Sequence, residues 1–403
     1  MHQVQPKANL RYRHSRDYAD ELGQVATPQS IIDLLLEDFP PESRYILDLG
    51  AGDGRLAVAA AARCTATPDI LMLEGDGPRA QELVRQHPAA TTKHIDVLRD
   101  EAMQVLPEVF VADAVVSNPP YLEVYLEPSH RSMVREVFPF LADSAWVRAE
   151  IAFLAQAWRL SAPGAFLGFV VPEPLITRQT YRDLRQFLVS HLHELTVTQL
   201  PSRCFVGVEV DAFLVTGRRA CAPLHEPSPR LRQADKEGRI LAECHVSESQ
   251  ACERMDYISH SQVDGCSASS DTLGSLGIEI VRGSQAKAAF VRDSLICVHT
   301  SDLLVTEPLT LKGQGGPHRT ASAGDILIPR VGSRCLDREA WVGQGEGAFT
   351  DSVYRLRGAP ALMPRVWRAL ASPAGREWRR ANAVGSCAKH LPLWLLARFP
   401  VPK

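Results

Sequence analysis

Long apolar runs, paired cysteines and an apolar leader are all missing from this chain of 403 residues. No window approaches the roughly 18 consecutive apolar residues of a membrane-spanning helix. The N-terminal stretch is polar and lacks the apolar core of a secretory signal, so we expect no signal peptide. The nine cysteines are scattered and show no C-x-x-C spacing, which argues against a zinc site or a disulfide framework. These absences favour a cytoplasmic protein that binds neither metal nor membrane.

Net charge is also small, at −3, but the two ends of the chain differ in sign. From Asp271 onward there are 18 Lys and Arg against 11 Asp and Glu, a balance of about +7. The preceding residues therefore carry a balance of about −10. A basic C-terminal part is typical of proteins that bind a polyanion, and equally of a solvated surface rich in arginine.

Residues 1–217 alternate between helical and strand patterns, which predicts an α/β fold with a mostly parallel, seven-stranded sheet. "ATPQSIIDLLLEDF" predicts an amphipathic helix with Thr27 as its N-cap and Pro28 in its first turn. Strands are expected at "RYILDLG", "DILMLEG", "TKHIDV", "ADAVVS", "AFLGFVV", "HELTVTQL" and "VDAFLVTG".

Beyond this part the pattern weakens. Residues 218–270 are rich in proline, serine and charge, and they predict a linker region with some structure in it. Residues 271–403 predict a second compact domain of mixed α+β type, with a strand at "GDILIPRVG" and helices at "MPRVWRALAS" and "PLWLLARF".

"DLGAGDG" follows the first predicted strand and is typical of a nucleotide-binding βα turn. Its glycines, Gly50, Gly52 and Gly54, permit a tight turn and close backbone approach to a ligand. Glu74 ends the next strand, where an acidic side chain is placed to bind ribose hydroxyls. Asp96 ends the third strand in the same manner and could accept a hydrogen bond from an adenine amino group. Each feature alone is equally typical of a structural turn or an exposed carboxylate, but together they indicate a ligand site.

"SNPPY" follows the fourth strand and predicts amine chemistry. The Asn118 side-chain oxygen and the Pro119 carbonyl, held rigid by Pro119 and Pro120, are acceptors for two N–H groups of one exocyclic amine. Accepting both protons would push the nitrogen toward tetrahedral geometry and free its lone pair. Tyr121 would stack on the planar base that carries the amine. The structural alternative is a proline-rich turn that caps a strand.

The order "LGQVATP", "DLGAGDG", "LEGD", "HIDV" and "SNPPY" resembles the S-adenosylmethionine-dependent DNA adenine-N6 methyltransferases of the gamma class. That class places a G-Q-x-x-T-P element before the glycine loop and a target-recognition domain at the C-terminus. The resemblance covers about residues 20–217. NPPY also occurs in methyltransferases that act on release-factor glutamine or on RNA, from which the upstream element and the large C-terminal part separate this chain.

The resemblance implies a Rossmann-like class I methyltransferase domain with S-adenosyl-L-methionine as cofactor. It assigns the cofactor to Gln24, Thr27 and Pro28 at the methionine end, Asp48 with Gly50, Gly52 and Gly54 at the loop, Glu74 at the ribose and Asp96 at the adenine. Phe205 would stack on the flipped base opposite Tyr121. One departure is Leu49, where the class often has proline.

The C-terminal part is similar to the recognition modules of DNA methyltransferases and restriction specificity subunits, at "LGSLGIEIVRGSQ", "AGDILIPRVG" and "VGSCAKHL". Arginines contact phosphates and guanine edges in such modules, and Arg282, Arg319, Arg330 and Arg334 are candidates here. The expected partner is duplex DNA, bound by a monomer, with a cognate restriction endonuclease encoded separately.

The sequence therefore predicts an adenine-specific DNA methyltransferase of a restriction–modification or phage-defence system, acting on a flipped-out adenine. An RNA or protein-glutamine N-methyltransferase with the same NPPY chemistry is the alternative enzyme. A DNA-binding specificity protein with a relic methyltransferase fold is the alternative without catalysis. Methyl transfer to DNA, RNA and protein discriminates between the first two, and S-adenosylmethionine binding tests the third.

Overall fold

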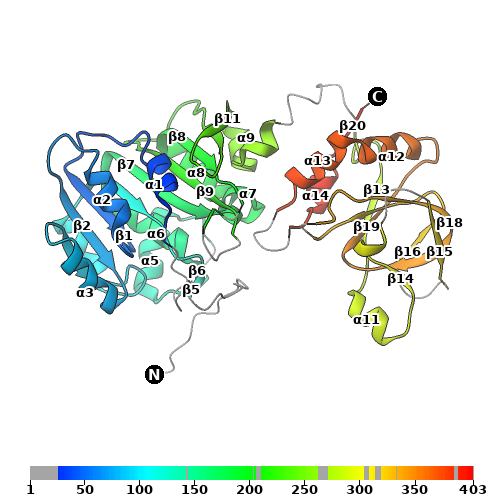
Figure 1. Cartoon of the computed structure of the whole chain (residues 1–403), viewed down its shortest axis with the longest axis horizontal. Coiled ribbons are helices and arrows are strands. Elements are labelled where there is room, and N and C mark those ends of the chain that lie inside the picture. The colour runs from blue at the N-terminus through cyan, green and yellow to red at the C-terminus, as the bar shows by residue number, and fades with distance from the viewer. Residues whose placement is uncertain are drawn as a thin grey trace. The chain divides into compact units, whose positions relative to one another are not determined.

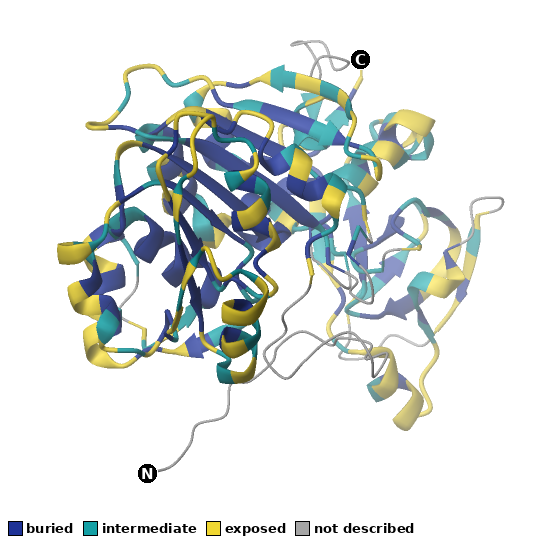
Figure 2. Cartoon of the chain, turned by 60° about the vertical axis from the view of Figure 1, so that its left-hand side comes forward, coloured by how far each residue is buried: buried dark blue, intermediate teal, exposed yellow. Residues whose placement is uncertain are grey.

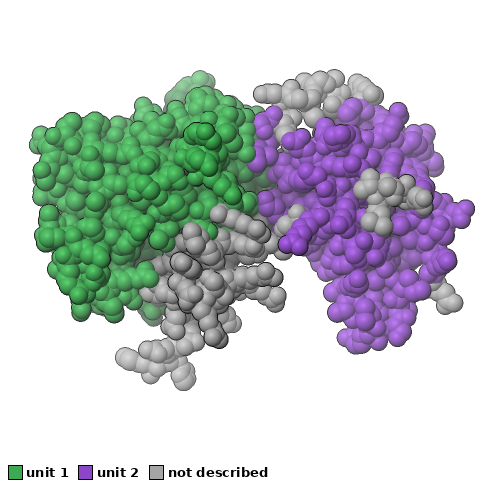
Figure 3. Space-filling view, viewed as in Figure 1, with its two compact units in different colours: residues 1–257 green, residues 258–403 purple. Residues whose placement is uncertain are grey.

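The computed structural model describes residues 26–141, 144–202, 204–205, 210–261, 271–303, 308–313, 319–332, 334–384 and 389–402. The chain divides into two compact units, residues 1–257 and 258–403 (Figure 3). Each unit has its own sheet and its own hydrophobic core. No helix in the described ranges combines the length and the apolar character that crossing a membrane requires.

The first unit is built on one nine-stranded sheet with helices on both faces (Figure 1). The strand order is β3-β2-β1-β4-β7-β9-β8-β10-β11, and β9 and β11 run antiparallel to their neighbours. The strands are Tyr45–Leu49 (β1), Asp69–Glu74 (β2), Thr91–His94 (β3), Ala112–Ser117 (β4), Ser161–Pro172 (β7), Leu192–Gln199 (β8), Ala212–Arg219 (β9), Arg230–Ala234 (β10) and Ile240–His245 (β11). The predicted fold class, a mostly parallel sheet followed by a separate mixed unit, is confirmed.

Successive residues of a strand face opposite sides of the sheet, so a strand that is apolar throughout needs helices on both faces. Along β1, Ile46 packs into the cluster formed with α1 and α2, whereas Leu47 and Leu49 pack into the cluster on the other face. Figure 2 shows these central strands buried between exposed helix faces. The helices are Gln29–Leu35 (α1), Arg55–Ala61 (α2), Gly77–Gln86 (α3), Ala102–Val109 (α4), Pro128–Val137 (α5), Ala149–Arg159 (α6), Glu173–Thr177 (α7), Arg182–His191 (α8), Glu248–Glu253 (α9) and Tyr257–Ser261 (α10), with the 3-10 turn Gln179–Tyr181 (η1).

The first predicted helix differs at its start. Pro28, not Thr27, occupies the N-cap position of α1, and no side chain caps this helix. The Thr27 hydroxyl is instead engaged by Asn118, ninety-one positions later. A tertiary contact thus replaces the expected local one.

Residues 218–270, predicted as a linker, contribute two strands to the first sheet. β10 pairs in parallel with β8, and β11 pairs antiparallel with β10, so the sheet has nine strands instead of seven. Arg232 in β10 bonds to Glu37 and Glu243, which explains how an arginine is tolerated at a nearly buried position. These strands were not predicted because charged and polar residues dominate the segment, although Leu231 of β10 packs into the core. Residues 262–270 lie outside the described ranges.

The second unit is organised around a long central strand, β18. The strand order is β13-β19-β17-β18-β14, and β15 and β16 also pair with β18. The strands are Glu279–Arg282 (β13), Cys297–Val298 (β14), Leu309–Lys312 (β15), Thr320–Ser322 (β16), Ile326–Pro329 (β17), Ala340–Phe349 (β18) and Val353–Arg357 (β19), with a separate pair Asp271–Thr272 (β12) and Pro400–Val401 (β20). The helices are Lys287–Arg292 (α11), Met363–Ala371 (α12), Pro373–Ala381 (α13) and Leu393–Leu396 (α14), with the 3-10 turn Thr300–Asp302 (η2).

The predicted strand and both predicted helices of this unit are β17, α12 and α14. The glycine-containing strand β18, "AWVGQGEGAF", was not predicted, because glycine is unfavourable in strands. Tertiary packing explains the exception: a Cβ on Gly345 would lie 2.1 Å from the Leu311 carbonyl oxygen of β15. Neighbouring strands pack so closely here that a side chain has no room.

A buried ion pair joins the helices of the second unit to its sheet. The Arg379 guanidinium on α13 bonds to the Glu339 carboxylate just before β18, and both side chains are fully buried. Arg379 also donates to the carbonyls of Arg338, at 2.6 Å, and Leu370, at 3.0 Å. Arg376 contacts the same carboxylate. Glu339 therefore serves as the counter-charge of two guanidinium groups, one of which is fully buried.

We expect Glu339→Gln to destabilise the second unit by about 3–5 kcal/mol, because it leaves a buried guanidinium without its counter-charge. The neighbouring pair Arg380–Asp337 is exposed and serves as the matched control. Asp337→Asn should change the free energy of unfolding by less than about 1 kcal/mol. Denaturant unfolding of the full chain measures both. Equal effects of the two substitutions would contradict a structural role for the buried pair.

Candidate active site

The carboxyl ends of β1, β2 and β4 meet at one edge of the first sheet. Asp48 on β1 is in register with Met72 on β2 and with Val116 on β4. The residues that follow on these strands therefore lie side by side, and they are the glycine loop, Glu74 and the NPPY loop. Ligands of open α/β sheets bind at this kind of edge.

The glycine loop has the backbone conformation that the sequence predicts. Gly50, Gly52 and Gly54 have φ values of 70°, 59° and 77°, which side-chain-bearing residues rarely adopt. A Cβ on Gly50 would lie 3.0 Å from the Phe153 ring, whereas the space beside Gly52 is open. The loop thus packs on α6 at Gly50 and leaves open space beside the Cα of Gly52.

Asp48 is a fully buried carboxylate with spare acceptor capacity. Its Oδ2 accepts the Ala57 backbone N–H at 3.2 Å, and its Oδ1 has no hydrogen-bond partner among the described residues. Burial raises the pKa of Asp48 to about 8, although the Ala57 hydrogen bond lowers it, and the charges of Glu74 and Asp53 raise it further. A cationic group bound nearby would favour the ionised form.

Glu74 is also buried, and it supports the glycine loop. Its Oε2 accepts the Gly52 N–H at 2.8 Å, and its Oε1 accepts the Asp76 N–H at 2.9 Å. This anchoring role was not predicted. It is compatible with ribose binding, because each carboxylate oxygen accepts more than one hydrogen bond.

Asp96 lies in the loop after β3, two residues beyond the strand end. Its Oδ1 accepts the Leu98 N–H at 2.9 Å. A Cβ placed on Gly75 would lie 3.6 Å from the Asp96 Cβ, so the loops after β2 and β3 are in contact. The structure thus brings the predicted ribose and adenine residues to one place.

The NPPY loop is tied to both neighbouring elements. The Ser117 hydroxyl donates to the Leu49 carbonyl at 2.6 Å, which holds the end of β4 against the glycine loop. The Asn118 Nδ2 donates to the Thr27 Oγ1 at 3.1 Å, which links the loop to the segment before α1. Sequence reasoning missed both contacts, although a serine at the end of an apolar strand is a usable signal for the first.

The Thr27 contact orients the Asn118 amide. An amide has one NH₂ end and one oxygen end, and the NH₂ end faces Thr27. The Oδ1 acceptor is therefore directed to the other side of the amide. Thr27 is 5% exposed, so water competes little for this hydrogen bond.

The two predicted stacking residues belong to one hydrophobic cluster. Tyr121 is 7% exposed and Phe205 is 4% exposed, and both pack with residues of α1, β4 and β9. A base that enters between the rings must therefore displace their present neighbours. Phe205 is therefore also a buried core residue, as is common for phenylalanine.

Some predicted site residues are not described. Gln24 lies outside the described ranges with the rest of residues 1–25, so nothing structural bears on its role.

The described prolines of the site have structural positions as well. Pro28 is the N-cap of α1, and Pro119 is buried beside Asn118. Among the described residues, no group of three or more His, Cys, Asp or Glu side chains is placed to hold a metal ion.

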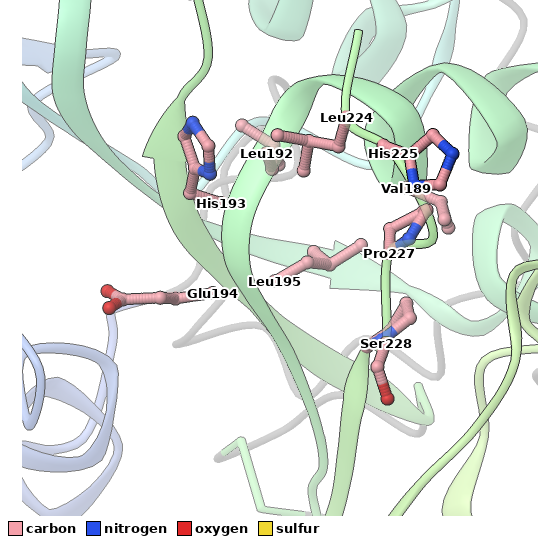
Figure 4. A pocket seen from close by; sticks show the side chains of 10 residues that line it. Val189, Leu192, His193, Glu194, Leu195, Leu224, His225, Pro227 and Ser228 are labelled. Carbon is pink, nitrogen blue, oxygen red and sulfur yellow. The ribbon is translucent and has the colours of Figure 1, made fainter.

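A cavity of about 420 Å³ lies elsewhere in the first unit (Figure 4). Its wall includes Leu192 and His193 at the start of β8 and His225 and Ser228 in the segment that leads into β10. β8 is parallel to β7 and hence to β1. The start of β8 is therefore at the sheet edge opposite the glycine and NPPY loops, and this cavity is not part of the candidate active site.

Comparison with known proteins agrees with this geometry. Residues 30–136 match the family model of the methyltransferase small domain. The tRNA1(Val) (adenine(37)-N6)-methyltransferase of Glaesserella parasuis is 32% identical over 136 residues, which are 33% of this chain and 53% of that protein. The chain therefore spans about half the length of this curated relative.

Two solved structures are similar to parts of this chain. The type IIG restriction endonuclease BpuSI is 14% identical, with a TM-score of 0.50 over 94% of this chain and 59% of that one. A modification subunit of a putative type I restriction enzyme from Vibrio vulnificus is 16% identical, with a TM-score of 0.45 over 57% of this chain and 56% of that one. At 14% identity, the similarity to BpuSI concerns the fold alone.

The fold and the family match define the first unit as a methyltransferase domain of the S-adenosyl-L-methionine-dependent class. The residues present fit that cofactor. The space beside the Gly52 Cα is open, and the buried Asp48 on β1 has one carboxylate oxygen without a hydrogen-bond partner among the described residues. These features suit a nucleoside that carries positive charge.

Proposed function

We propose that this chain is a site-specific DNA adenine-N6 methyltransferase of a restriction–modification or phage-defence system. The observation that carries the proposal is the NPPY loop at the carboxyl edge of the sheet, hydrogen-bonded to the Thr27 segment and to the glycine loop. A rigid pair of acceptors next to a cofactor loop is suited to an exocyclic amine. The basic second unit supplies a surface for a polyanion.

In this proposal the NPPY residues activate and hold the target amine. The Asn118 Oδ1 and the Pro119 carbonyl accept the two N6 protons, so that the nitrogen lone pair is no longer delocalised into the ring. Tyr121 and Phe205 stack on the two faces of the flipped adenine. When bound, S-adenosyl-L-methionine supplies an electrophilic methyl group on a sulfonium sulfur.

The remaining assignments concern cofactor binding. Asp48 and the glycine loop would hold the cofactor, Glu74 would bind its ribose, and Asp96 would bind its adenine amino group. Gln24, Thr27 and Pro28 would close over its methionine end. No covalent enzyme intermediate is required, and none of the cysteines has a role in this scheme.

Expression in a host that lacks DNA methylation tests the proposal. Sequencing of the host DNA for N6-methyladenine would give the activity, the target base and the recognition sequence together. Asn118→Ala, expressed to the same level, is the negative control. Folded protein without methylated adenine in the DNA would contradict the proposal for the chain acting alone.

An RNA adenine-N6 methyltransferase is the second candidate, favoured by the tRNA enzyme of Glaesserella parasuis among the relatives. Purified protein should be offered duplex DNA, total tRNA and a protein substrate with labelled cofactor. Faster transfer to tRNA than to duplex DNA would replace the first candidate by the second.

Thr27 gives a further prediction, because its hydroxyl accepts the Asn118 amide N–H. Thr27→Val should lower the methyl-transfer rate about 10-fold by freeing the amide to rotate, in line with the loss of one buried hydrogen bond. Thr27→Ser, which keeps the acceptor, should retain most of the rate. Single-turnover kinetics measure the rate, and calorimetry measures cofactor affinity.

A double-mutant cycle separates this role from direct cofactor binding. If Thr27 acts through Asn118, then Thr27→Val should have little further effect on the residual rate of Asn118→Ala. A loss of cofactor affinity in Thr27→Val, with an unchanged rate at saturating cofactor, would assign Thr27 to the cofactor instead.

A further inference from the structure

Two groups of arginines in the second unit look alike in the sequence but differ in their partners. Seven of the fourteen arginines in residues 258–403 pair with a carboxylate other than Asp351: Arg292 with Asp293, Arg355 with Glu279, Arg357 with Asp325, Arg365 with Asp271, Arg376 and Arg379 with Glu339, and Arg380 with Asp337. Six carboxylates thus offset most of the charge of these seven arginines. These pairs account for much of the arginine content without offering charge to a partner.

A second group surrounds a single carboxylate, Asp351, at one end of the sheet. Arg282 donates from Nη2 to the Asp351 Oδ2 at 3.0 Å and from Nε to the Asp351 carbonyl at 3.2 Å. Arg330 donates from Nε to the same carbonyl at 2.7 Å. Arg319 donates to the Arg282 carbonyl at 2.6 Å. Only Arg282 contacts the Asp351 carboxylate, because the other two bonds go to backbone carbonyls. Three guanidinium groups thus gather around one carboxylate, which leaves a local charge of about +2.

The sheet holds this arginine cluster (Arg282, Arg319 and Arg330) in place. Arg282 ends β13 and Arg330 follows β17, and these two strands flank β19 on either side. The Arg330 N–H donates to the Ser352 carbonyl at 2.8 Å, in the turn that precedes β19. Both side chains therefore start from fixed backbone at the same sheet edge.

Close packing fixes the Arg282 side of the cluster. A Cβ on Gly283 would lie 2.1 Å from the Thr350 carbonyl oxygen, so the chain after Arg282 lies directly against the turn before β19. The Asp351 N–H donates to the Gln285 carbonyl at 2.7 Å. Such preorganisation reduces the entropy lost when a ligand is bound.

Donor groups in the cluster are left for a ligand. The Nη1 and Nη2 groups of Arg330 have no hydrogen-bond partner among the described residues, and Arg282 keeps 48% of its side chain exposed. Burial lowers the pKa of Arg330, and the charge of Arg282 lowers it further, so the two guanidinium groups repel one another. An anion bound between them would relieve this repulsion and use the free donors.

We infer that Arg282 and Arg330, with Arg319 beside them, form a binding site for a backbone phosphate of duplex DNA. The inference rests on the proposed function for the choice of DNA as the partner. Guanidinium groups match phosphate oxygens in geometry, and phosphate contacts orient a protein on DNA without reading its sequence. This site would position the second unit, and bases would be read by other residues.

Binding of the full chain to a labelled duplex, followed by fluorescence anisotropy over a series of salt concentrations, tests the site. Arg282→Gln and Arg330→Gln should each weaken binding about 8-fold near 0.1 M salt and reduce the slope of log K against log salt by about 1. Asp351→Asn should do the opposite, because it removes the single carboxylate of the cluster. It should strengthen binding several-fold and steepen the slope.

Arg368→Gln is the matched control, because Arg368 is an exposed arginine on α12 that donates only weakly, at 3.4 Å, to the Pro364 carbonyl. It should bind as the wild type does. Thermal melting checks the fold of each variant. Asp351→Asn is a second check, because misfolding would weaken DNA binding, whereas this substitution is expected to strengthen it. The inference would be overturned if both arginine variants bound the duplex with the affinity and the salt dependence of the wild type.

A different result would contradict the proposed function. A wild-type chain that does not bind duplex DNA, or that binds single-stranded RNA of the same length more tightly, would contradict DNA as the substrate and overturn the site's partner with it. Duplex binding by the wild type with unchanged arginine variants would overturn the phosphate site alone.

Discussion

Replacing Asn118 by alanine is expected to lower the rate of methyl transfer by a factor of about 100 or more, with little change in cofactor affinity. The amide oxygen is one of two proposed acceptors for the target amine, and loss of one preorganised hydrogen-bonding group of this kind typically costs 100- to 1000-fold in rate. The amide also donates to Thr27, so the substitution leaves that hydroxyl without this donor as well.

Single-turnover kinetics with the cognate duplex measure the rate, and calorimetry measures cofactor affinity. The proposed mechanism requires the rate to fall while the cofactor dissociation constant stays within about a factor of three. Loss of cofactor binding would move Asn118 from the amine to the cofactor site. A retained rate would leave the Pro119 carbonyl as a sufficient acceptor and refute the role of the amide.

The second large effect concerns Asp48, whose pKa is raised from 3.8 to about 8 by burial. Its ionised form is disfavoured in the folded state. At pH values below 3.8 the group is protonated in both states and has no effect. Between about pH 4 and pH 8 the folded state binds more protons than the unfolded state, so stability falls as pH rises. Above about pH 8 the full penalty is present.

Asp48→Asn removes this penalty and keeps an oxygen for the Ala57 N–H. We expect the cofactor-free variant to be more stable than the wild type by about 4 kcal/mol at pH 7, and equal to it near pH 4. Thermal melting at both pH values measures the difference. A variant that is less stable than the wild type at pH 7 would show that the Asp48 carboxylate is stabilised by its surroundings.

The same carboxylate predicts a proton coupled to cofactor binding. The positive charges of S-adenosyl-L-methionine favour ionised Asp48, so binding at pH 7 should release up to about one proton, and affinity should rise with pH toward pH 8. Calorimetry in two buffers with different ionisation enthalpies counts the protons. Asp48→Asn should bind the cofactor more weakly and release none of them. Equal proton release by this variant would exclude Asp48 as the source.

Much of the first unit could be predicted because its signals are local. Apolar strands of five to eight residues, glycines at left-handed turns and acidic residues at strand ends are imposed by the chain's own sterics and hydrophobicity, so "DLGAGDG" and Glu74 lie where their patterns place them. The two strands in residues 230–245 were not predicted because they lie in a segment rich in proline, serine and charge, and their pairing with the sheet edge is a tertiary contact.

The sequence by itself determined the class of the first unit and the residues at its candidate site, through motifs whose chemistry depends on residue type and order. Only the tertiary structure decided how those residues are used. In the structure Thr27 bonds to Asn118 and does not cap a helix, and Glu74 accepts a hydrogen bond from the glycine loop. The structure also pairs half of the arginines of the second unit with other carboxylates, while Arg282 and Arg330 bond to Asp351 and Arg319 bonds to Arg282. Side-chain partners far apart in the chain depend on packing, and no local pattern encodes them.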